Sequence, residues 1–440
     1  MASEFSRNEA IKQVWPLILA NATTPLLGLV DTAILGHGGR VSDLGALALG
    51  SLVFNFLYWG LGFLRMATTG FVAQAAGAGD ELKLFVSVAR PVFLGALLGT
   101  LLLGFAPLLA RFAFWLLGGE PAVETVAQEY FFARVAGAPA HLASLGGVGL
   151  LIGLGRSKQL LLVQVCTNTL NIALDLAFVT GLGLGARGVG FGTAIAEWGG
   201  ALLCLSIARR ELAHRGFNWP GWAVVFDPVG LRNSWSANTD ILIRTLAMIL
   251  GFSYFTNQGA RWGAVVLAGN HLLLQFISFS AFFLDGFAHV AEAHVGKAVG
   301  ARKVASFDRA LRVTGELAVI CALALGLLVL LLGSALVGVL TDIPAVRAQA
   351  DVYLPWAALY IACSVAAFQL DGVFIGASAT GKMRTAALVS VASFFSLCAL
   401  LTPRYHNAGL WWAFCGYVVV RGISLAFSLP SLRRAIAAPG

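Results

Sequence analysis

Charge is what this sequence has least of. Only 11% of its 440 residues are Asp, Glu, Lys or Arg, whereas a soluble globular chain has about 25%. This shortage excludes an ordinary water-soluble protein, and no stretch is long and polar enough to form a separate soluble domain. Hydrophobic residues make up 58% of the chain, and its mean hydropathy is +0.83. We therefore expect an all-α polytopic membrane protein.

Metal-binding patterns are also lacking. The one candidate is "HVAEAH", but His294 lies roughly 140° around a helix from His289, so the HExxH spacing of zinc proteases is absent. The cysteines lie inside apolar runs, with no pair at metal-ligand spacing, and we interpret them as small packing residues. We expect no metal and no cofactor. The six cysteines are Cys166, Cys204, Cys321, Cys363, Cys398 and Cys415.

Long apolar runs, separated by short polar breaks, fill nearly the whole chain. The polar start has no signal-peptide pattern, so we expect the first helix to be retained. Runs of this length predict twelve transmembrane helices. Their expected bounds are 11–36, 44–75, 84–110, 126–153, 159–181, 188–209, 233–257, 263–295, 305–333, 347–376, 384–402 and 408–430.

The basic residues predict an orientation. If the N-terminus is cytoplasmic, the cytoplasmic segments hold 19 Lys and Arg residues and the opposite side holds 6, as the positive-inside rule requires. Both termini are then cytoplasmic, and the protein is expected in an inner or plasma membrane. The net charge of +8 fits a surface that faces anionic lipid, so we expect no nucleic-acid partner. Four arginines fall within or at the edge of helices: Arg65, Arg134, Arg244 and Arg421.

Glycine motifs recur at a fixed distance along the chain. Gly77 and Gly300 occupy similar turns 223 residues apart, and Gly153 and Gly376 are separated by the same distance. Two motifs at one offset predict two six-helix halves in the same orientation, an arrangement typical of transporters. The expected parts are an N-lobe of helices 1–6 at 1–209, a cytoplasmic inter-lobe loop at 210–232, and a C-lobe of helices 7–12 at 233–440.

Narrow polar stripes mark the first half. Asp31 lies in the first predicted helix, and Asn171 and Asp175 share a face of the fifth. A carboxylate in the middle of a membrane helix costs about 2.5–3.5 kcal/mol on insertion scales, so Asp31 calls for a function. Removal from water disfavours the charged form of a carboxyl group, and two neighbouring carboxyl groups share one proton. We therefore predict proton binding at Asp31, for which a compact cation could compete.

The second half carries stripes of its own, which do not match those of the first. They contain Asp285 and Glu292 in the eighth predicted helix, and Tyr360 and Asp371 in the tenth. Such a stripe is typical of interhelical packing as well as of a site. Arg65 and Arg244 are either cavity residues or structural partners of a carboxylate. Two further carboxylates, Glu197 and Asp240, could lie near helix ends.

Two prolines in the first helix, Pro16 and Pro25, remove backbone hydrogen bonds and permit a bend. The hypothesis is that proton binding at Asp31 changes this bend and with it the shape of a first-half cavity. Static kinks are the alternative for either proline.

Several segments resemble the MATE family (multidrug and toxic compound extrusion), most closely its DinF-like branch. They are "WPLILANATTPLLGLVDTAILGH", "LRMATTGFVAQAAGAGD", "TNTLNIALDLAFV", "FFLDGFAHVAEAHVGKAVGAR" and "LDGVFIGA". The resemblance covers nearly the whole chain. It implies two six-helix lobes related by pseudo-twofold symmetry, which exchange drugs or toxins for protons or sodium.

The resemblance also implies roles for individual residues. Asp31 corresponds to the coupling carboxylate, Asn171 and Asp175 to its fifth-helix partners, and Thr193 to a hydroxyl that lines the same pocket. Pro16 corresponds to the bending proline. The chain departs from the sodium-coupled NorM-like pattern, because Asn257 and Gln258 replace a glutamate and only Asp371 matches its tenth-helix acid. This difference favours protons over sodium.

Three functions are compatible with a polytopic membrane protein of this kind, and they make different demands on the sequence. An antiporter that exports amphipathic, often cationic, compounds fits apolar walls with few carboxylates. A flippase for lipid-linked precursors would need several basic residues for pyrophosphate, and only Arg65 and Arg244 are candidates. An intramembrane enzyme would need a nucleophile and base, and no such pair has suitable spacing. We expect a transporter, not an enzyme, that works on small-molecule drugs or toxins within the lipid bilayer as a monomer.

Overall fold

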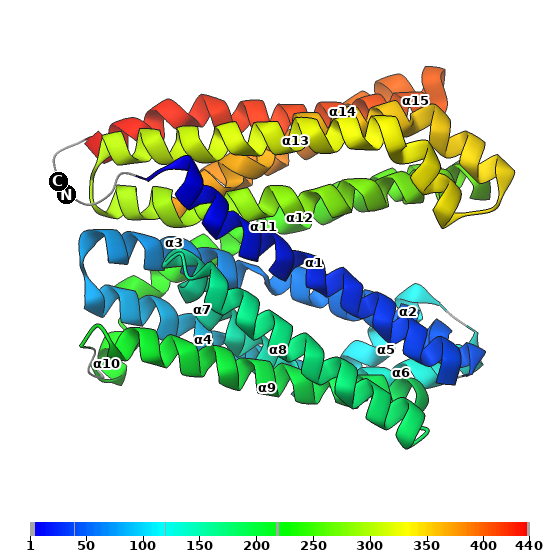
Figure 1. Ribbon diagram of the computed structural model, residues 1–440, viewed down its shortest axis with the longest axis horizontal. Coiled ribbons are helices and arrows are strands. Elements are labelled where there is room, and N and C mark those ends of the chain that lie inside the picture. The colour runs from blue at the N-terminus through cyan, green and yellow to red at the C-terminus, as the bar shows by residue number, and fades with distance from the viewer. Residues whose placement is uncertain (1–4, 39, 119, 217–219, 438–440) are drawn as a thin grey trace. The chain divides into compact units, whose positions relative to one another are not determined.

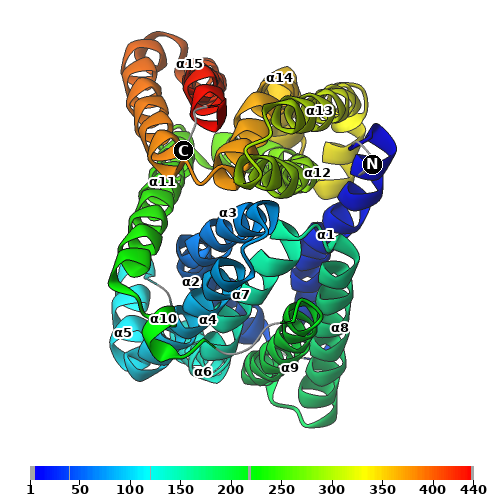
Figure 2. The same ribbon diagram turned by 90° about the vertical axis from the view of Figure 1, so that its left-hand side faces the viewer.

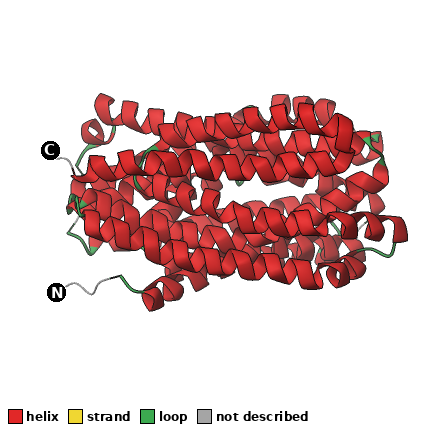
Figure 3. Cartoon of the chain, turned by 90° about the horizontal axis from the view of Figure 1, so that it is seen from above, coloured by secondary structure: helices red, strands yellow, loops and turns green. Residues whose placement is uncertain are grey.

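The computed structural model describes residues 5–38, 40–118, 120–216 and 220–437. Every secondary-structure element in these ranges is a helix (Figure 3). The helices are α1 (Arg7–Gly38), α2 (Val41–Leu61), α3 (Phe63–Ala78), α4 (Glu81–Gly104), α5 (Ala106–Leu117), α6 (Pro121–Val135), α7 (Ala138–Gly153), α8 (Ser157–Asp175), the π-helix η1 (Leu176–Gly181), α9 (Gly185–Ala213), α10 (Trp222–Val225), α11 (Pro228–Arg261), α12 (Ala264–Gly300), α13 (Val304–Leu340), α14 (Pro344–Gly376) and α15 (Thr380–Ala437).

The predicted membrane segments all lie on helices. Within the described residues, ten helical stretches are long and apolar enough to span a bilayer, and the pair α6 and α7, bent by 51°, makes an eleventh. The longest helix, α15, is two helices joined at His406, where φ is 47° and ψ is −125°. Counting its halves separately gives one helix for each of the twelve predicted segments. The chain is a multi-span membrane protein.

Some predicted helices are broken where the sequence showed no obvious break. The second is divided between α2 and α3 at Gly62, and the third between α4 and α5 at Phe105. The fourth is divided between α6 and α7, where Pro139 takes one of the first positions of α7. A proline is tolerated there because the first turn of a helix has no partner for its N–H groups.

Contacts group the chain into two units, which we call unit 1 and unit 2. Unit 2 is Leu19–Ser234, and unit 1 is the chain up to Ile18 together with Trp235–Gly440. In unit 2, α7 packs against α3, α4 and α9. In unit 1, α14 packs against α12, α13 and α15. Figures 1 and 2 show these neighbours running side by side within each unit.

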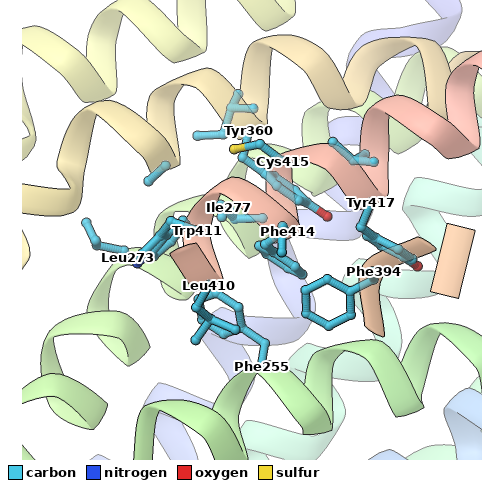
Figure 4. Close-up of a cluster of buried hydrophobic side chains, with 14 of the residues drawn as sticks. Phe255, Leu273, Ile277, Tyr360, Phe394, Leu410, Trp411, Phe414, Cys415 and Tyr417 are labelled. Carbon is cyan, nitrogen blue, oxygen red and sulfur yellow. The ribbon is translucent and has the colours of Figure 1, made fainter. Parts of the chain in front are cut away.

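The core of unit 1 is strongly aromatic (Figure 4). Phe414 is fully buried and stacks on Tyr360, with ring centroids 4.5 Å apart. Phe255 and Trp411 pack on one another nearby at 5.0 Å. Rings of this size each bury about 150–250 Å², so this cluster fixes how α11, α14 and α15 pack together.

Both units contain the same close helix contact. In unit 2, a Cβ atom on Gly153 of α7 would lie 2.8 Å from the backbone oxygen of Thr69 on α3. In unit 1, a Cβ atom on Gly376 of α14 would lie 2.5 Å from the backbone oxygen of Glu292 on α12. Each residue of the first contact precedes its counterpart in the second by 223 positions, the offset of the glycine motifs.

Candidate functional site

Helix α8 brings three polar side chains to one buried face. Asn168, Asn171 and Asp175 follow at intervals of three and four residues, and all three are buried, Asp175 completely. The π-helix η1 begins directly after Asp175. π-helical turns are rare and are found mostly at functional sites. The spacing predicted this face correctly, but the change of helix type gave no sequence signal.

Helix α9 supplies the space and a hydroxyl group. A Cβ atom on Gly192 would lie 2.1 Å from Oδ1 of Asp175, so only glycine leaves room for this carboxyl group. The neighbouring Thr193 donates its hydroxyl proton to the backbone oxygen of Val189 at 2.9 Å. The Thr193 hydroxyl oxygen accepts from Nδ2 of Asn171 at 3.3 Å, and the same nitrogen lies 3.3 Å from Oδ1 of Asp175.

Asp31 completes the group from α1. Its carboxyl group lies within hydrogen-bonding distance of that of Asp175. Within the described residues, Oδ1 of Asp31 and Oδ2 of Asp175 are buried and have no donor, and neither has Oδ1 of Asn171. Two facing carboxylates cannot both be charged at low cost, whereas a proton held between them removes the repulsion. The structure thus brings Asp31, Asn171, Asp175 and Thr193 together, and we call these four residues the carboxyl-pair site.

One cation acts on this site. Arg134, on α6, interacts electrostatically with both Asp31 and Asp175. Its Nη1 donates to the Tyr130 hydroxyl at 2.5 Å, and its guanidinium carbon lies 4.5 Å from the ring centroid of Phe54. The sequence placed Arg134 within a helix but gave it no role. The direction of such a long side chain depends on neighbouring helices, which the sequence does not reveal.

The second-half candidates lie in unit 1 and are arranged differently. Asp371 forms ion pairs with both Arg244 and Arg421, and all three side chains are buried. Asp285 and Glu292 act electrostatically on Arg244. Both arginines bind Oδ2 of Asp371, while its buried Oδ1 has no hydrogen-bond partner among the described residues. A buried carboxylate with two cationic partners is held in place, so this arrangement favours a structural role for Asp371. The predicted partnership of Arg244 with a carboxylate is found, and Arg421 is an additional partner.

The remaining candidates are dispersed. Tyr360 lies in the aromatic core of unit 1, and Arg65 is a partly buried residue of α3 in unit 2. Asp240 of α11 pairs with Arg384 at 2.7 Å and accepts from the Thr380 hydroxyl at 2.9 Å, an arrangement that connects α11 with the first turns of α15.

Both helix-1 prolines lie inside the uninterrupted helix α1. Pro16 is buried and Pro25 is exposed. The contact boundary between the two units, after Ile18, falls between them. Their proposed action as hinges stays a prediction.

Among the described residues, no group of three or more His, Cys, Asp and Glu side chains is placed to hold a metal ion. All six cysteines are free thiols, and Cys204, Cys398 and Cys415 are buried. Their burial agrees with the interpretation as packing residues.

Comparisons with known proteins agree with this architecture. The family model described as MatE matches the chain twice, over residues 16–177 and 242–403. DNA damage-inducible protein F of Escherichia coli is 35% identical over 426 residues, which cover 94% of this chain and 91% of that protein. A probable multidrug resistance protein NorM of Neisseria meningitidis is 25% identical over 94% of this chain and 92% of its own length.

Solved structures share the fold. The Vibrio cholerae MATE transporter VcmN, in a bent form, superposes with a TM-score of 0.87 at 18% identity, over 98% of this chain and 97% of that chain. A MOP superfamily transporter from Pyrococcus furiosus superposes with a TM-score of 0.83 at 19% identity, over 99% and 97% of the two chains. The family model, the identity to the Escherichia coli relative and the shared fold together show that this chain belongs to the MatE family.

Proposed function

We propose that this protein is a secondary active efflux antiporter that exports amphipathic, often cationic, compounds in exchange for protons, with Asp31 as the coupling carboxylate. The observation that carries the proposal is the pair formed by Asp31 and Asp175, in which one buried oxygen of each has no donor among the described residues. The names of relatives that are multidrug resistance proteins support the substrate class.

The pair suits proton exchange because its two states differ in charge. With a proton between them, Asp31 and Asp175 carry one negative charge; without it, they carry two, which repel each other. A pH difference of one unit is worth about 1.4 kcal/mol per proton. That energy biases two conformations of similar free energy, provided that protonation favours one of them.

Sodium is the alternative coupling ion. Three buried oxygen atoms without donors, one each from Asp31, Asn171 and Asp175, are hard ligands that would also attract a compact cation. The test below therefore separates protons from sodium.

A flippase of lipid-linked precursors is the second candidate, and it has less support. Its cavity would need free basic groups for a pyrophosphate. Arg244, one of the two candidates from the sequence, forms an ion pair with Asp371. The carboxyl-pair site, in addition, has a chemistry that repels anions.

The proposed transporter has a defined orientation in the membrane and is divided into two lobes. Both termini face the cytoplasm, as the basic loops predict. The lobes at 1–209 and 233–440, joined by the loop at 210–232, move relative to one another during transport, and one chain is sufficient for the cycle.

The function is tested in proteoliposomes with an acidic lumen and no sodium. Adding ethidium, a fluoroquinolone or a bile salt outside should dissipate the pH gradient with the wild-type protein, and Asp31→Asn should abolish the response. Asp342→Asn is the matched control, because its carboxylate is fully exposed in a turn, and it should behave like wild type. Exchange that requires a sodium gradient and ignores the pH gradient would overturn proton coupling.

A further inference from the structure

A second group of buried ionisable side chains lies at the break between α6 and α7. Within the described part of unit 2, α9 contacts this break through two consecutive residues. Nε1 of Trp198 donates to the backbone oxygen of Ala136 at 3.0 Å. Glu197 extends its carboxyl group to the adjoining turn, where a Cβ atom on Gly137 would lie 2.1 Å from its Oε2 atom. The 51° bend thus creates the space that Glu197 fills.

Glu197 lies among polar groups, although its buried Oε2 atom has no hydrogen-bond partner within the described residues. The side chain is 9% exposed, and it lies beside the first turn of α7, whose N–H groups have no partner within the helix. Nδ1 of His141 lies 3.8 Å from its Oε1 atom. The ring of His141 stacks on Tyr58 at 4.1 Å, and the Tyr58 side chain interacts electrostatically with the same carboxyl group.

Arg134 connects this group with the carboxyl-pair site. It lies in the last turn of α6, immediately before the break. Its guanidinium interacts electrostatically with Glu197 on one side and with Asp31 and Asp175 on the other. One cation is therefore shared between a single carboxyl group and a pair of carboxyl groups.

We propose that Glu197 is a positioning residue, which holds Arg134 and offsets its charge, and so sets how tightly the Asp31–Asp175 pair binds its coupling cation. The proposal rests on the proposed function, because it names a residue that tunes the same site. With Glu197 charged, the field of Arg134 at the pair is partly cancelled. Without that charge, Arg134 repels an incoming cation more strongly and turns toward the remaining carboxylates.

Other ionisable groups face Glu197 from each helix packed around it. Tyr58 comes from α2, Arg134 from α6 and His141 from α7. Of these, Arg134 carries a fixed positive charge, because a guanidinium is not deprotonated in proteins. The effect of Glu197 on the pair therefore acts mainly through Arg134.

The test reads protonation directly and does not require transport. A carbodiimide modifies protonated buried carboxyl groups, and mass spectrometry of the peptides that contain Asp31 and Asp175 gives the extent of labelling at each pH. Glu197→Gln should shift the labelling midpoint to lower pH by about one unit, a tenfold loss of proton affinity. Arg134→Gln should shift it to higher pH, and the double variant should lie between the two.

Two controls separate positioning from folding. Trp198→Phe removes the hydrogen bond to the same break without changing charge, so it should leave the midpoint where it is in wild type. Glu197→Asp keeps the charge, so its labelling midpoint should lie close to that of wild type. An unchanged midpoint in Glu197→Gln, or shifts of the same sign in Glu197→Gln and Arg134→Gln, would overturn the proposal.

The two proposals fail in different ways. If the wild-type protein labels normally but shows no proton-driven exchange, the proposed function fails and the role of Glu197 is still decided by the labelling midpoints. If sodium drives exchange, Glu197→Gln should again weaken cation binding at the pair, because Arg134 repels any cation. Glu197→Gln should then raise the half-saturating sodium concentration about tenfold, and an unchanged concentration would contradict the role assigned to Glu197.

Discussion

Asp31 and Asp175 differ from the other buried carboxylates in having each other as neighbours. Asp371 has two arginine partners, and Asp240 has an arginine and a threonine hydroxyl. Such carboxylates are held in place by their partners. The Asp31–Asp175 pair instead has a second carboxyl group beside the first, so its charge changes when its proton leaves.

Gly192 gives the first prediction at the residue scale. Gly192→Ala would place a methyl group 2.1 Å from Oδ1 of Asp175, so the carboxyl group must move and the pair must open. We expect at least a tenfold loss of proton-driven exchange in proteoliposomes. In enzymes, moving a reacting group by about 1 Å can lower the reaction rate about 10²-fold.

Gly60 on α2 is the matched glycine, because a Cβ atom there would have no neighbour within 4 Å. Gly60→Ala should exchange at the wild-type rate. Equal activity of Gly192→Ala and Gly60→Ala would show that the position of the Asp175 carboxyl group does not matter.

Asp371 gives a contrasting prediction. Asp371→Asn leaves Arg244 and Arg421 buried without their carboxylate, and breaking a buried ion pair from one side costs about 3–5 kcal/mol. We expect a clearly lower melting temperature in detergent. Asp31→Asn removes a repulsion rather than a partner, so its melting temperature should equal or exceed that of wild type. The reverse order of the two melting temperatures would contradict these roles.

Part of the carboxyl-pair site could be predicted from residues alone. Helical spacing placed Asn171 and Asp175 on one face, and the cost of burial singled out Asp31. Their proximity came only from the family resemblance, because spacing within one helix does not say which other helix it contacts. The position of Arg134 could not be predicted from either source.

At the scale of the helices, the repeated glycine contact is one determinant of packing. Gly372 and Gly376 on α14 form a small-xxx-small pair, which allows the backbones of α14 and α12 to approach closely. Membrane helices have no hydrophobic driving force for association, so such contacts supply much of the attraction between them.

Gly376→Ala tests this contact. Its methyl group would lie 2.5 Å from the backbone oxygen of Glu292, so the two helices must separate. Overpacking of this kind costs about 1–3 kcal/mol, and we expect a lower melting temperature. Gly338→Ala on α13, where a Cβ atom meets nothing within 4 Å, should leave it unchanged or raise it slightly. A Gly376→Ala protein as stable as wild type would show that α12 and α14 do not pack this closely.

The sequence predicted the helices better than their breaks. Apolar length identified every membrane segment, and the offset of 223 residues identified the repeat. The break near His406 was predicted, because it falls between the expected helices 384–402 and 408–430. The breaks at Gly62 and Phe105 were not predicted, because each depends on contacts with neighbouring helices that the sequence does not reveal. No single residue type marks them.

At the scale of the whole molecule, the charge distribution predicts which loops face the cytoplasm. Lys303, in the turn between α12 and α13, should be cytoplasmic, and Asp342, in the turn between α13 and α14, should be outside. Both side chains are exposed. In a variant without the six native cysteines, a membrane-impermeant maleimide added to intact cells should label Asp342→Cys and spare Lys303→Cys. Labelling of Lys303→Cys alone would invert the orientation.

In the mechanism proposed above, the Asp31–Asp175 pair holds a proton that substrate binding displaces. The most direct measurement adds ethidium to the purified protein in weakly buffered detergent at neutral pH and follows a pH indicator. The account predicts the release of roughly one proton per chain, since two neighbouring carboxyl groups share one, and no release from Asp31→Asn. Saturating binding of ethidium to the wild-type protein with no release of protons would contradict it.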